Sequence, residues 1–396
     1  MQTVKNSRSV VLAGGCLLAI VALGFGQSRL STPTVEAQTK QAPMFEVDPF
    51  WPRPLPNHWV LGSAIGVGVD ARDHVWIVHR GSTLAASEIP ATLDPPIAET
   101  CCTPAPPVLE FDPDGVIVGS WGGAGTGYTW PSSNHGITID HMDNVWIGGN
   151  GQDDSHVLKF TRDGRFLLEV GEPGLGVDSS SKTHYSRVAK IGIDPTANEA
   201  YLADGYGNHR VAVVDMTTGA FKRHWGAYGN EPDDSDFGRY NPNGPPPQQF
   251  GNPVHCAEVS RDGLVYVCDR AQDRIQVFQK DGTFVKEGFV AKTTLGSGSM
   301  WDLAFSHDED QRYLYAADGV NEKVYIIERK SLEVLTSFGD GGRQAGAFFG
   351  VHSIATDSDG NIYTTETFEG KRLQKFVFRG IGPVTALDQG VVWPSN

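Results

Sequence analysis

The sequence predicts an all-β fold, a single six-bladed β-propeller. The first observation is a repeat, because a unit with the same order of parts occurs six times along the chain. The second is the alternation of apolar and polar residues within each part, which is typical of half-buried strands. The third is composition: 47 glycines and 24 prolines in 396 residues suit a protein with many turns. Six small sheets in a ring protect their edges by closing on themselves.

Each copy of the unit is predicted to be a four-stranded meander. An apolar strand is followed by a turn that contains Asp, a strand with an aromatic residue, a short loop, an amphipathic strand, a second turn and a last strand that commonly ends near Gly. The sixth copy lacks a clear fourth strand, and we expect residues 45–47 to supply it and close the ring. The six copies span residues 65–122, 135–171, 190–226, 255–288, 301–339 and 352–378.

Two long segments interrupt the repeat. Residues 81–107 split the first copy and contain several prolines, whereas residues 230–249 form a loop rich in Pro, Gly and Asp before the fourth copy. Loops of this length inside a compact domain usually carry function. We expect these two segments to form a lid over one face of the propeller.

The N-terminal segment indicates export from the cytoplasm. Residues 1–37 are interpreted as a signal peptide or an N-terminal anchor, because Lys5 and Arg8 precede an apolar run at 10–26. The propeller domain is expected to span residues 44–396, as a monomer in the periplasm or the extracellular space. Membrane contact is expected only if the N-terminal segment stays uncleaved. The formal net charge of −15 argues against nucleic acid as a partner.

Four cysteines follow the N-terminal segment, an even number that suits an oxidising compartment. They permit three pairings, which the sequence does not decide. If Ser260 and Leu264 face each other across a turn, Cys256 and Cys268 also face each other on adjacent strands, close enough for a disulfide. Two buried free thiols explain the same pattern equally well. The four residues are Cys101, Cys102, Cys256 and Cys268.

Three histidines occupy the same position in alternate copies of the unit. Alternate blades of a six-bladed ring place these imidazoles about 120° apart around the axis and at equal depth. Three neutral imidazole nitrogens with an open fourth position are the ligand set of a catalytic zinc ion. His135, His255 and His352 are therefore predicted to bind zinc. Aligned on the first strand of each copy, the six residues in this position are Ile65, His135, Ala189, His255, Trp301 and His352.

Two arginines stand at a second aligned position, where the second strand of each copy ends. Arg80 and Arg270 fall in the first and fourth copies, on opposite sides of the ring. Guanidinium groups bind carboxylates in a bidentate manner, so the pair suits an anionic group beside the metal. The alternative is an ordinary ion pair, for instance between Arg270 and Asp269. The aligned residues are Arg80, Asn150, Gly205, Arg270, Gly319 and Thr367.

A tyrosine follows the same strand end in the third copy. Tyr206 lies in the run Asp-Gly-Tyr-Gly-Asn-His-Arg at 204–210. A phenol near a divalent cation and two arginines is a candidate base. A role in packing or hydrogen bonding is the alternative.

Taken together, these motifs resemble those of one family. They are VHRG at 78–81, HGITID at 135–140, DGYGNHR at 204–210, VH at 254–255, CDR at 268–270 with DRIQ at 273–276, and the last histidine with Asp-Gly at 359–360. The repeat resembles NHL-type propellers, and the combination is similar to the peptidyl-α-hydroxyglycine α-amidating lyases over nearly all of residues 60–378.

This resemblance implies a reaction and a role for each site residue. The substrate would be a peptide or small molecule that ends in α-hydroxyglycine with a free carboxylate, and the products would be an amide and glyoxylate. Tyr206 would remove the proton of the hydroxyl group, and Arg80 and Arg270 would position the substrate. The three histidines would hold Zn²⁺.

The resemblance also has a departure. The family holds a structural Ca²⁺ with an Asp directly after the third zinc-binding histidine and with backbone carbonyl groups. Here Ser353 stands in place of that Asp, and the carbonyl positions fall at Val67 and Ile137. The serine weakens the case for calcium.

Two other functions fit the same scaffold. One is a calcium-dependent propeller lactonase or hydrolase, with Asn150 or Glu366 among the ligands, since calcium sites draw on amide and carboxylate oxygens. The other is a non-catalytic NHL-propeller binding protein, because a fold alone does not decide function.

Overall fold

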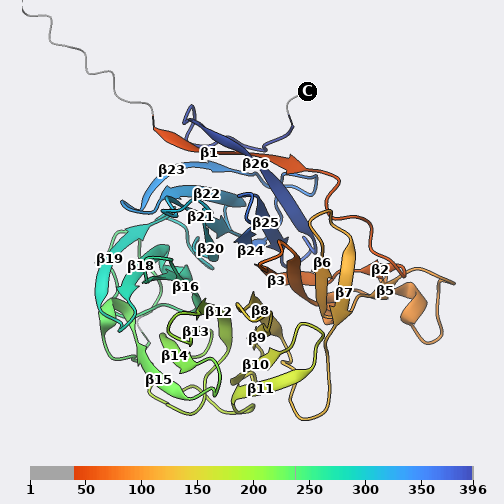
Figure 1. Ribbon diagram of the computed structural model, residues 1–396, viewed down its shortest axis with the longest axis horizontal. Coiled ribbons are helices and arrows are strands. Elements are labelled where there is room, and N and C mark those ends of the chain that lie inside the picture. The colour runs from red at the N-terminus through yellow and green to blue at the C-terminus, as the bar shows by residue number, and fades with distance from the viewer. Residues whose placement is uncertain (1–39, 237, 395–396) are drawn as a thin grey trace, which may run out of the picture. The chain divides into compact units, whose positions relative to one another are not determined.

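The computed structural model describes residues 40–236 and 238–394, and its strands from Gln41 onward form one compact unit. Six four-stranded antiparallel sheets surround a central axis, as the sequence predicts (Figure 1). Consecutive innermost strands lie side by side around that axis. These innermost strands are β3 (Ser63–Val69), β8 (Asn134–Ile139), β12 (Val188–Asp194), β16 (Val254–Val259), β20 (Asp302–Phe305) and β24 (Val351–Thr356).

The remaining strands follow outward in each blade. The second strands are β4 (Val75–Arg80), β9 (Val145–Gly149), β13 (Glu199–Asp204), β17 (Leu264–Asp269), β21 (Tyr313–Asp318) and β25 (Ile362–Glu366). The third are β6 (Val108–Phe111), β10 (His156–Phe160), β14 (Arg210–Asp215), β18 (Arg274–Gln279), β22 (Lys323–Glu328) and β26 (Leu373–Pro383). The outer strands are β7 (Ile117–Trp121), β11 (Phe166–Gly171), β15 (Phe221–Trp225), β19 (Phe284–Phe289), β23 (Glu333–Phe338) and β1 (Gln41–Asp48).

Strand β1 closes the ring, which confirms the expected role of residues 45–47. It pairs with β26 in the sixth blade, with Phe45 opposite Phe378. The two strands lie together at the top of Figure 1. The Phe45 ring is buried, and its centroid lies 5.4 Å from that of Tyr315 and 5.6 Å from that of Phe338, both in the fifth blade. The first described strand of the chain thereby joins the last two blades.

A buried carboxylate explains why Asp recurs in the first turn of the unit. In several blades this Asp accepts a hydrogen bond from the aromatic residue of the second strand, which satisfies two buried polar groups at once. Trp76 Nε1 donates to Asp70 at 3.1 Å, and Trp146 Nε1 donates to Asp140 at 3.1 Å. In the sixth blade the Tyr363 hydroxyl donates to Asp357 at 2.9 Å.

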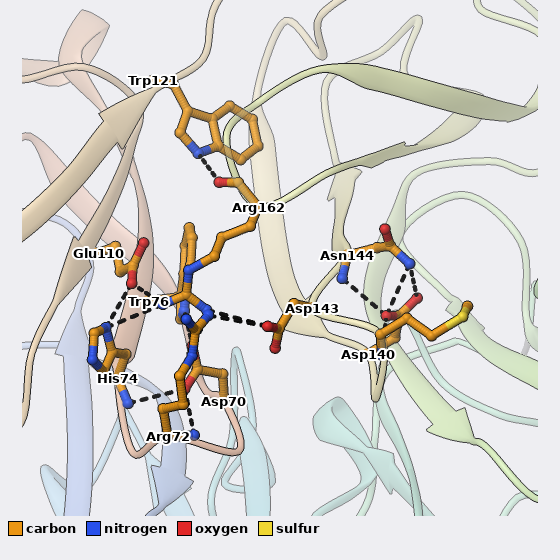
Figure 2. A network of polar contacts seen from close by, with 11 residues as sticks. Asp70, Arg72, His74, Trp76, Glu110, Trp121, Asp140, Asp143, Asn144 and Arg162 are labelled. Atoms are coloured by element: carbon orange, nitrogen blue, oxygen red, sulfur yellow. Dashed lines mark hydrogen bonds and ion pairs between the residues drawn. The ribbon is translucent and has the colours of Figure 1, made fainter.

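The seam between the first two blades contains a second cluster of potential metal ligands. Figure 2 shows Asp70, His74 and Glu110 gathered around the guanidinium group of Arg162, which reaches over from the second blade. His74 Nδ1 lies 2.6 Å from a Glu110 oxygen, and Arg162 also stacks 4.9 Å above the Trp76 ring. The arginine supplies the positive charge that the two carboxylates need, so we interpret the cluster as a bond between blades.

Both long insertions contain local structure among the described residues. Residues 81–107 include the 3₁₀ turns η1 (Gly81–Thr83) and η2 (Pro90–Thr92) and strand β5 (Thr103–Pro104), which pairs with β2 (Trp59–Val60). Within residues 230–249, the Asn230 side chain donates to the Gln248 carbonyl at 3.0 Å. Two further 3₁₀ turns are η3 (Ala227–Gly229) and η4 (Arg270–Gln272). A role as a lid stays a prediction.

The four cysteines form two disulfides. Cys256 and Cys268 are direct partners on β16 and β17 and form a disulfide. The alternative of two buried free thiols is therefore wrong. Cys101 is bonded to its neighbour Cys102. The segment interpreted as a signal peptide or anchor, residues 1–37, lies outside the described residues. Among the described residues, no helix is long and apolar enough to cross a membrane.

Candidate metal centre

Local breaks in strand pairing aim the three histidines at the axis. The pairing of β8 with β9 shifts between Asn134 and Ile137, and that of β16 with β17 shifts between Val254 and Cys256. The sixth blade has the same shift between Val351 and Ser353. Such bulges change the direction of a side chain within a strand. Each break falls at a predicted ligand, so the innermost strands present the imidazoles to the centre of the ring.

The structure brings the three predicted ligands together. The imidazole centroids of His135, His255 and His352 are 5.0, 4.8 and 4.9 Å apart, which is close to an equilateral triangle. One nitrogen from each ring lies within 4.8 Å of the other two, and all three residues are buried. Three nitrogens that converge from alternate blades can close on a single ion.

Backbone carbonyl groups fix which nitrogen of each ring faces the axis. Nδ1 of His135 donates to the Ala189 carbonyl at 2.8 Å, and Nδ1 of His352 donates to the Ile65 carbonyl at 2.6 Å. Nδ1 of His255 donates to the Trp301 carbonyl. A carbonyl oxygen only accepts, so the hydrogen of each neutral ring is on Nδ1. The lone pair of Nε2 is therefore left for a metal, as in other sites whose outer hydrogen bonds orient the ligands.

The three acceptor residues and the three histidines together account for the aligned position in all six blades. Ile65, Ala189 and Trp301 are the residues that occupy the aligned histidine position in the other three blades. Each histidine thus bonds to the same position of the next blade around the ring. Sequence reasoning identified the position and missed the role of its carbonyl groups, because a backbone acceptor leaves no residue-type signature.

The histidines are poised to bind as neutral ligands. Burial lowers the pKa of all three, to about 3 for His352 and well below the ordinary value for His135 and His255. The positive charge of Arg270 lowers the pKa of all three further, and that of Arg80 lowers the pKa of His135 and His352. Protons therefore compete weakly with a metal at neutral pH, which suits imidazole ligation.

Tyr206 lies at the point where the histidines converge. Its hydroxyl oxygen is 3.0 Å from Nε2 of His135, 3.0 Å from Nε2 of His255 and 2.9 Å from Nη1 of Arg270. The phenol has one hydrogen and can satisfy one imidazole at a time. One Nε2 lone pair of this pair therefore stays available at the same place. The turn that contains Tyr206 is fixed by a contact from the segment before the fourth blade, where the side-chain amide of Asn252 donates to the Tyr206 carbonyl at 2.8 Å.

Arg270 faces the site, and the proposed ion pair with Asp269 is wrong. Asp269 instead pairs with Arg274 at 2.8 Å and accepts from the Gly251 amide at 2.9 Å. The Arg270 guanidinium lies 4.7 Å from the Trp301 ring and donates to Tyr206. Its Nε atom is buried and has no hydrogen-bond partner among the described residues. An unsatisfied guanidinium donor beside the histidines is the donor chemistry that a substrate carboxylate needs.

Arg80 is hydrogen-bonded to strand β8, which carries His135. Its Nε donates to the carbonyl of Asn134 at 2.9 Å, and its Nη2 donates to the Asn150 side chain at 2.7 Å. Burial lowers the pKa of this guanidinium. Arg80 also lines a cavity of about 320 Å³ between the first two blades and the insertion at 81–107. The structure thus places Arg80 near His135, with part of its hydrogen-bonding capacity used by the protein.

The two residues suggested as calcium ligands are engaged elsewhere. Asn150 accepts from Arg80 and from the Ser133 hydroxyl at 2.8 Å. Glu366 is fully buried, where it accepts from Arg372 at 2.6 Å and from Gln374 at 2.7 Å. Neither side chain is presented as a free oxygen ligand.

Comparisons with known proteins show which proteins the chain resembles. No family model matches the chain. It is 24% identical to NHL repeat-containing protein 3 of Mus musculus over 300 residues, which is 74% of this chain and 69% of that protein. It is 24% identical to peptidyl-alpha-hydroxyglycine alpha-amidating lyase 1 of Drosophila melanogaster over 364 residues, or 85% of this chain and 60% of that protein.

A shorter match involves peptidyl-glycine alpha-amidating monooxygenase B of Xenopus laevis, which is 28% identical over 156 residues. That match spans 39% of this chain and 16% of the frog protein. A solved structure of a protein of unknown function from Bacteroides thetaiotaomicron shares the fold, with a TM-score of 0.52 at 13% identity over 87% of this chain and 77% of that chain. The chain is thus a six-bladed propeller that resembles NHL-repeat proteins and, more distantly, the peptidyl-α-hydroxyglycine α-amidating lyases.

Proposed function

We propose that the protein is a secreted, zinc-dependent lyase that splits an α-hydroxyglycine into an amide and glyoxylate. The observation that carries this proposal is the position of the Tyr206 hydroxyl, 3.0 Å from two histidine Nε2 atoms and 2.9 Å from an arginine. A base, a cation-binding triad and a carboxylate anchor meet there. The relatives named for amidation support the same chemistry.

The substrate would enter with its carboxylate toward Arg270. The unsatisfied Nε and the neighbouring Nη atoms of this guanidinium form a fork that binds a carboxylate in a bidentate manner. Stacking on Trp301 keeps the plane of the fork fixed, so little rotational freedom is lost on binding. The hydroxyl carbon of the substrate would then lie beside Tyr206.

The histidines would hold the metal through their Nε2 atoms, and Zn²⁺ bound there would acidify a neighbouring hydroxyl group. Tyr206 acts as the base that removes the hydroxyl proton of the substrate. The electrons of that O–H bond form the carbonyl of glyoxylate while the carbon–nitrogen bond breaks. The nitrogen takes up the proton that Tyr206 has gained and leaves as the amide, so atoms and charge balance. Arg270 keeps the carboxylate of the leaving glyoxylate in place.

The location outside the cytoplasm is part of the same proposal. Two disulfides in the described chain are compatible with an oxidising compartment. The formal net charge of −15 argues against nucleic acid as a partner, and we expect membrane contact only if the N-terminal segment stays uncleaved. We expect the protein to act as a monomer.

Zinc-loaded protein should release glyoxylate and benzamide in equal amounts from N-benzoyl-α-hydroxyglycine. His255→Ala should abolish both products, because it removes one ligand and leaves two. His141→Ala is the matched control, since this histidine is exposed and lies in a surface turn. Full turnover by His255→Ala would exclude the lyase proposal. Unchanged binding of a partner after loss of all three histidines would favour the binding-protein alternative.

A further inference from the structure

A largely buried lysine, Lys190, lines the same small cavity as the three histidines. Lys190 Nζ is 2.8 Å and 2.9 Å from the two carboxylate oxygens of Asp302 and 2.9 Å from a Glu258 oxygen. The side chains of Lys190 and Asp302 are 12% and 2% exposed, and that of Glu258 is 21% exposed. These residues come from three innermost strands, β12, β20 and β16. A cation and two carboxylates therefore meet inside the ring.

The same cluster reaches the sixth blade. The Ser353 hydroxyl donates to Asp302 at 2.6 Å, and the amide of Ile354 donates to the same carboxylate at 3.0 Å. Asp302 thus receives hydrogen bonds from β12 and β24 and holds both strands. Glu258 adds a bond between β12 and β16.

Three members of this cluster directly follow residues of the metal site in the chain. Lys190 follows Ala189, whose carbonyl holds His135, and Asp302 follows Trp301, whose carbonyl holds His255. Ser353 follows His352 itself. Lys190, Asp302 and Ser353 line the same small cavity as the three histidines. A change in this layer would therefore move the carbonyl groups that orient the ligands.

The lysine is charged in this environment. Burial alone lowers the pKa of Lys190, but the carboxylates of Asp302 and Glu258 outweigh burial and raise it. The ammonium group offsets one of the two carboxylate charges, so its removal would leave both carboxylates without a counter-ion in the ring.

The residues present do not fit the structural calcium that the family resemblance implies. Ser353 offers a hydroxyl that already donates to Asp302, and it accepts from the Val67 amide at 3.4 Å. Lys190 lines the same cavity as Val67 and Ile137, the two expected carbonyl positions. A divalent cation in this layer would face a fixed ammonium group, and like charges repel strongly where water is scarce.

We propose that Lys190 is the resident cation of this layer, an ammonium group that does the structural work of a second metal ion. It draws the innermost strands of the third, fourth and fifth blades together through Asp302 and Glu258, and Asp302 extends the bond to the sixth. The protein accordingly holds one divalent metal, at the histidines, and needs no calcium. This inference concerns the architecture of the channel and stands whether or not the protein is a lyase.

The test is to remove the ammonium group and ask whether calcium replaces it. Lys190→Ala leaves Asp302 and Glu258 unpaired around an empty space, so the variant should melt at a lower temperature than the wild type. Calcium chloride at millimolar concentration should raise the melting temperature of the variant by about 4 °C and leave the wild type unchanged. Elemental analysis should find about one calcium ion per chain in the variant alone.

Two variants serve as controls. Lys190→Arg keeps a cation in the layer and should not respond to calcium. Lys159→Ala removes another buried lysine, which pairs with one carboxylate, Asp140, at 3.3 Å, so it should lose stability without a calcium response.

Calcium that stabilises the wild type, or stoichiometric calcium in the wild type, would overturn the inference. So would a Lys190→Ala variant that binds no calcium. If Lys190→Ala does not fold, the two wild-type measurements still decide. Zinc content and glyoxylate release of the wild type report on the metal centre separately, so failure of one proposal is distinguishable from failure of the other.

Discussion

Nδ1 of His135 donates its hydrogen to the carbonyl oxygen of Ala189 at 2.8 Å, and the two residues occupy the same aligned position of consecutive blades. The ring repeats this relationship twice more, for His255 with Trp301 and for His352 with Ile65. The repeat of the propeller thus supplies each ligand together with the backbone acceptor that orients it. Three identical outer contacts leave three Nε2 lone pairs directed at one point.

Loss of the Tyr206 hydroxyl should impair turnover without loss of metal. Tyr206→Phe removes the proposed base and keeps the ring, so kcat should fall by roughly 10²–10⁴-fold with zinc content unchanged. Tyr228→Phe is a matched control, because this phenol also accepts from an arginine, Arg274, at 2.9 Å but lies in another turn. Equal losses in the two variants would assign Tyr206 a structural role.

Removal of the Arg270 guanidinium should weaken substrate binding through the carboxylate. Arg270→Ala should raise KM for N-benzoyl-α-hydroxyglycine by roughly 10–100-fold, because a charge-assisted hydrogen bond contributes about 1.5–3 kcal/mol. The corresponding substrate amide, which has no carboxylate, should be a poor substrate of both proteins. A variant with an unchanged KM for the acid would show that Arg270 does not bind the carboxylate.

Closure of the ring should depend on Phe45. Phe45→Ala leaves a cavity against Tyr315 and Phe338, and loss of a buried Phe typically costs about 3–5 kcal/mol of unfolding free energy. Urea unfolding measures the change. Phe50→Ala should change the unfolding free energy little, since the Phe50 ring is 79% exposed. Similar behaviour of both variants would argue against a closing role for β1.

One buried carboxyl group should make stability fall as pH rises. Burial, reinforced by the nearby Asp318, raises the pKa of Asp273 from 3.8 to about 7. A raised folded-state pKa favours the folded protein below pH 3.8, and this contribution is lost as pH rises through about 7. The Asp273→Asn variant does not lose stability in this way, because the amide side chain carries no charge at any pH in this range.

Asp273→Asn should therefore be more stable than the wild type at pH 8, by about 2–4 kcal/mol, and close to it at pH 4. The left-handed backbone of residue 273, with φ of 55°, accepts Asn readily. The amide oxygen can also keep the 2.8 Å bond from the Ser299 amide. Urea unfolding at both pH values measures the difference, and a pH-independent difference would contradict the assignment.

The repeat made much of the fold and the site predictable. Alignment of the copies identified His135, His255 and His352 as one set, and the missing strand of the sixth copy indicated the role of Phe45. The register across the turn between Ser260 and Leu264 also placed Cys256 opposite Cys268. These predictions depend on spacing along the chain, which a regular repeat converts directly into positions in space.

Contacts between blades were harder to foresee. Lys190 and Asp302 are 112 residues apart and meet only because the ring brings their strands together. Arg270 and Arg274 are both close to Asp269 in sequence, and the choice between them depends on which guanidinium lies on the buried face of the blade. Backbone acceptors such as the Ala189 carbonyl carry no sequence signature at all.

Whether the three histidines bind zinc can be measured by elemental analysis of the purified protein after dialysis against zinc. We expect about one zinc ion per chain in the wild type, and none in a variant with His135, His255 and His352 all replaced by alanine. Circular dichroism of the variant would confirm that the sheets remain. A wild-type protein without bound metal, or a triple variant that keeps its zinc, would show that the three histidines are not a zinc site.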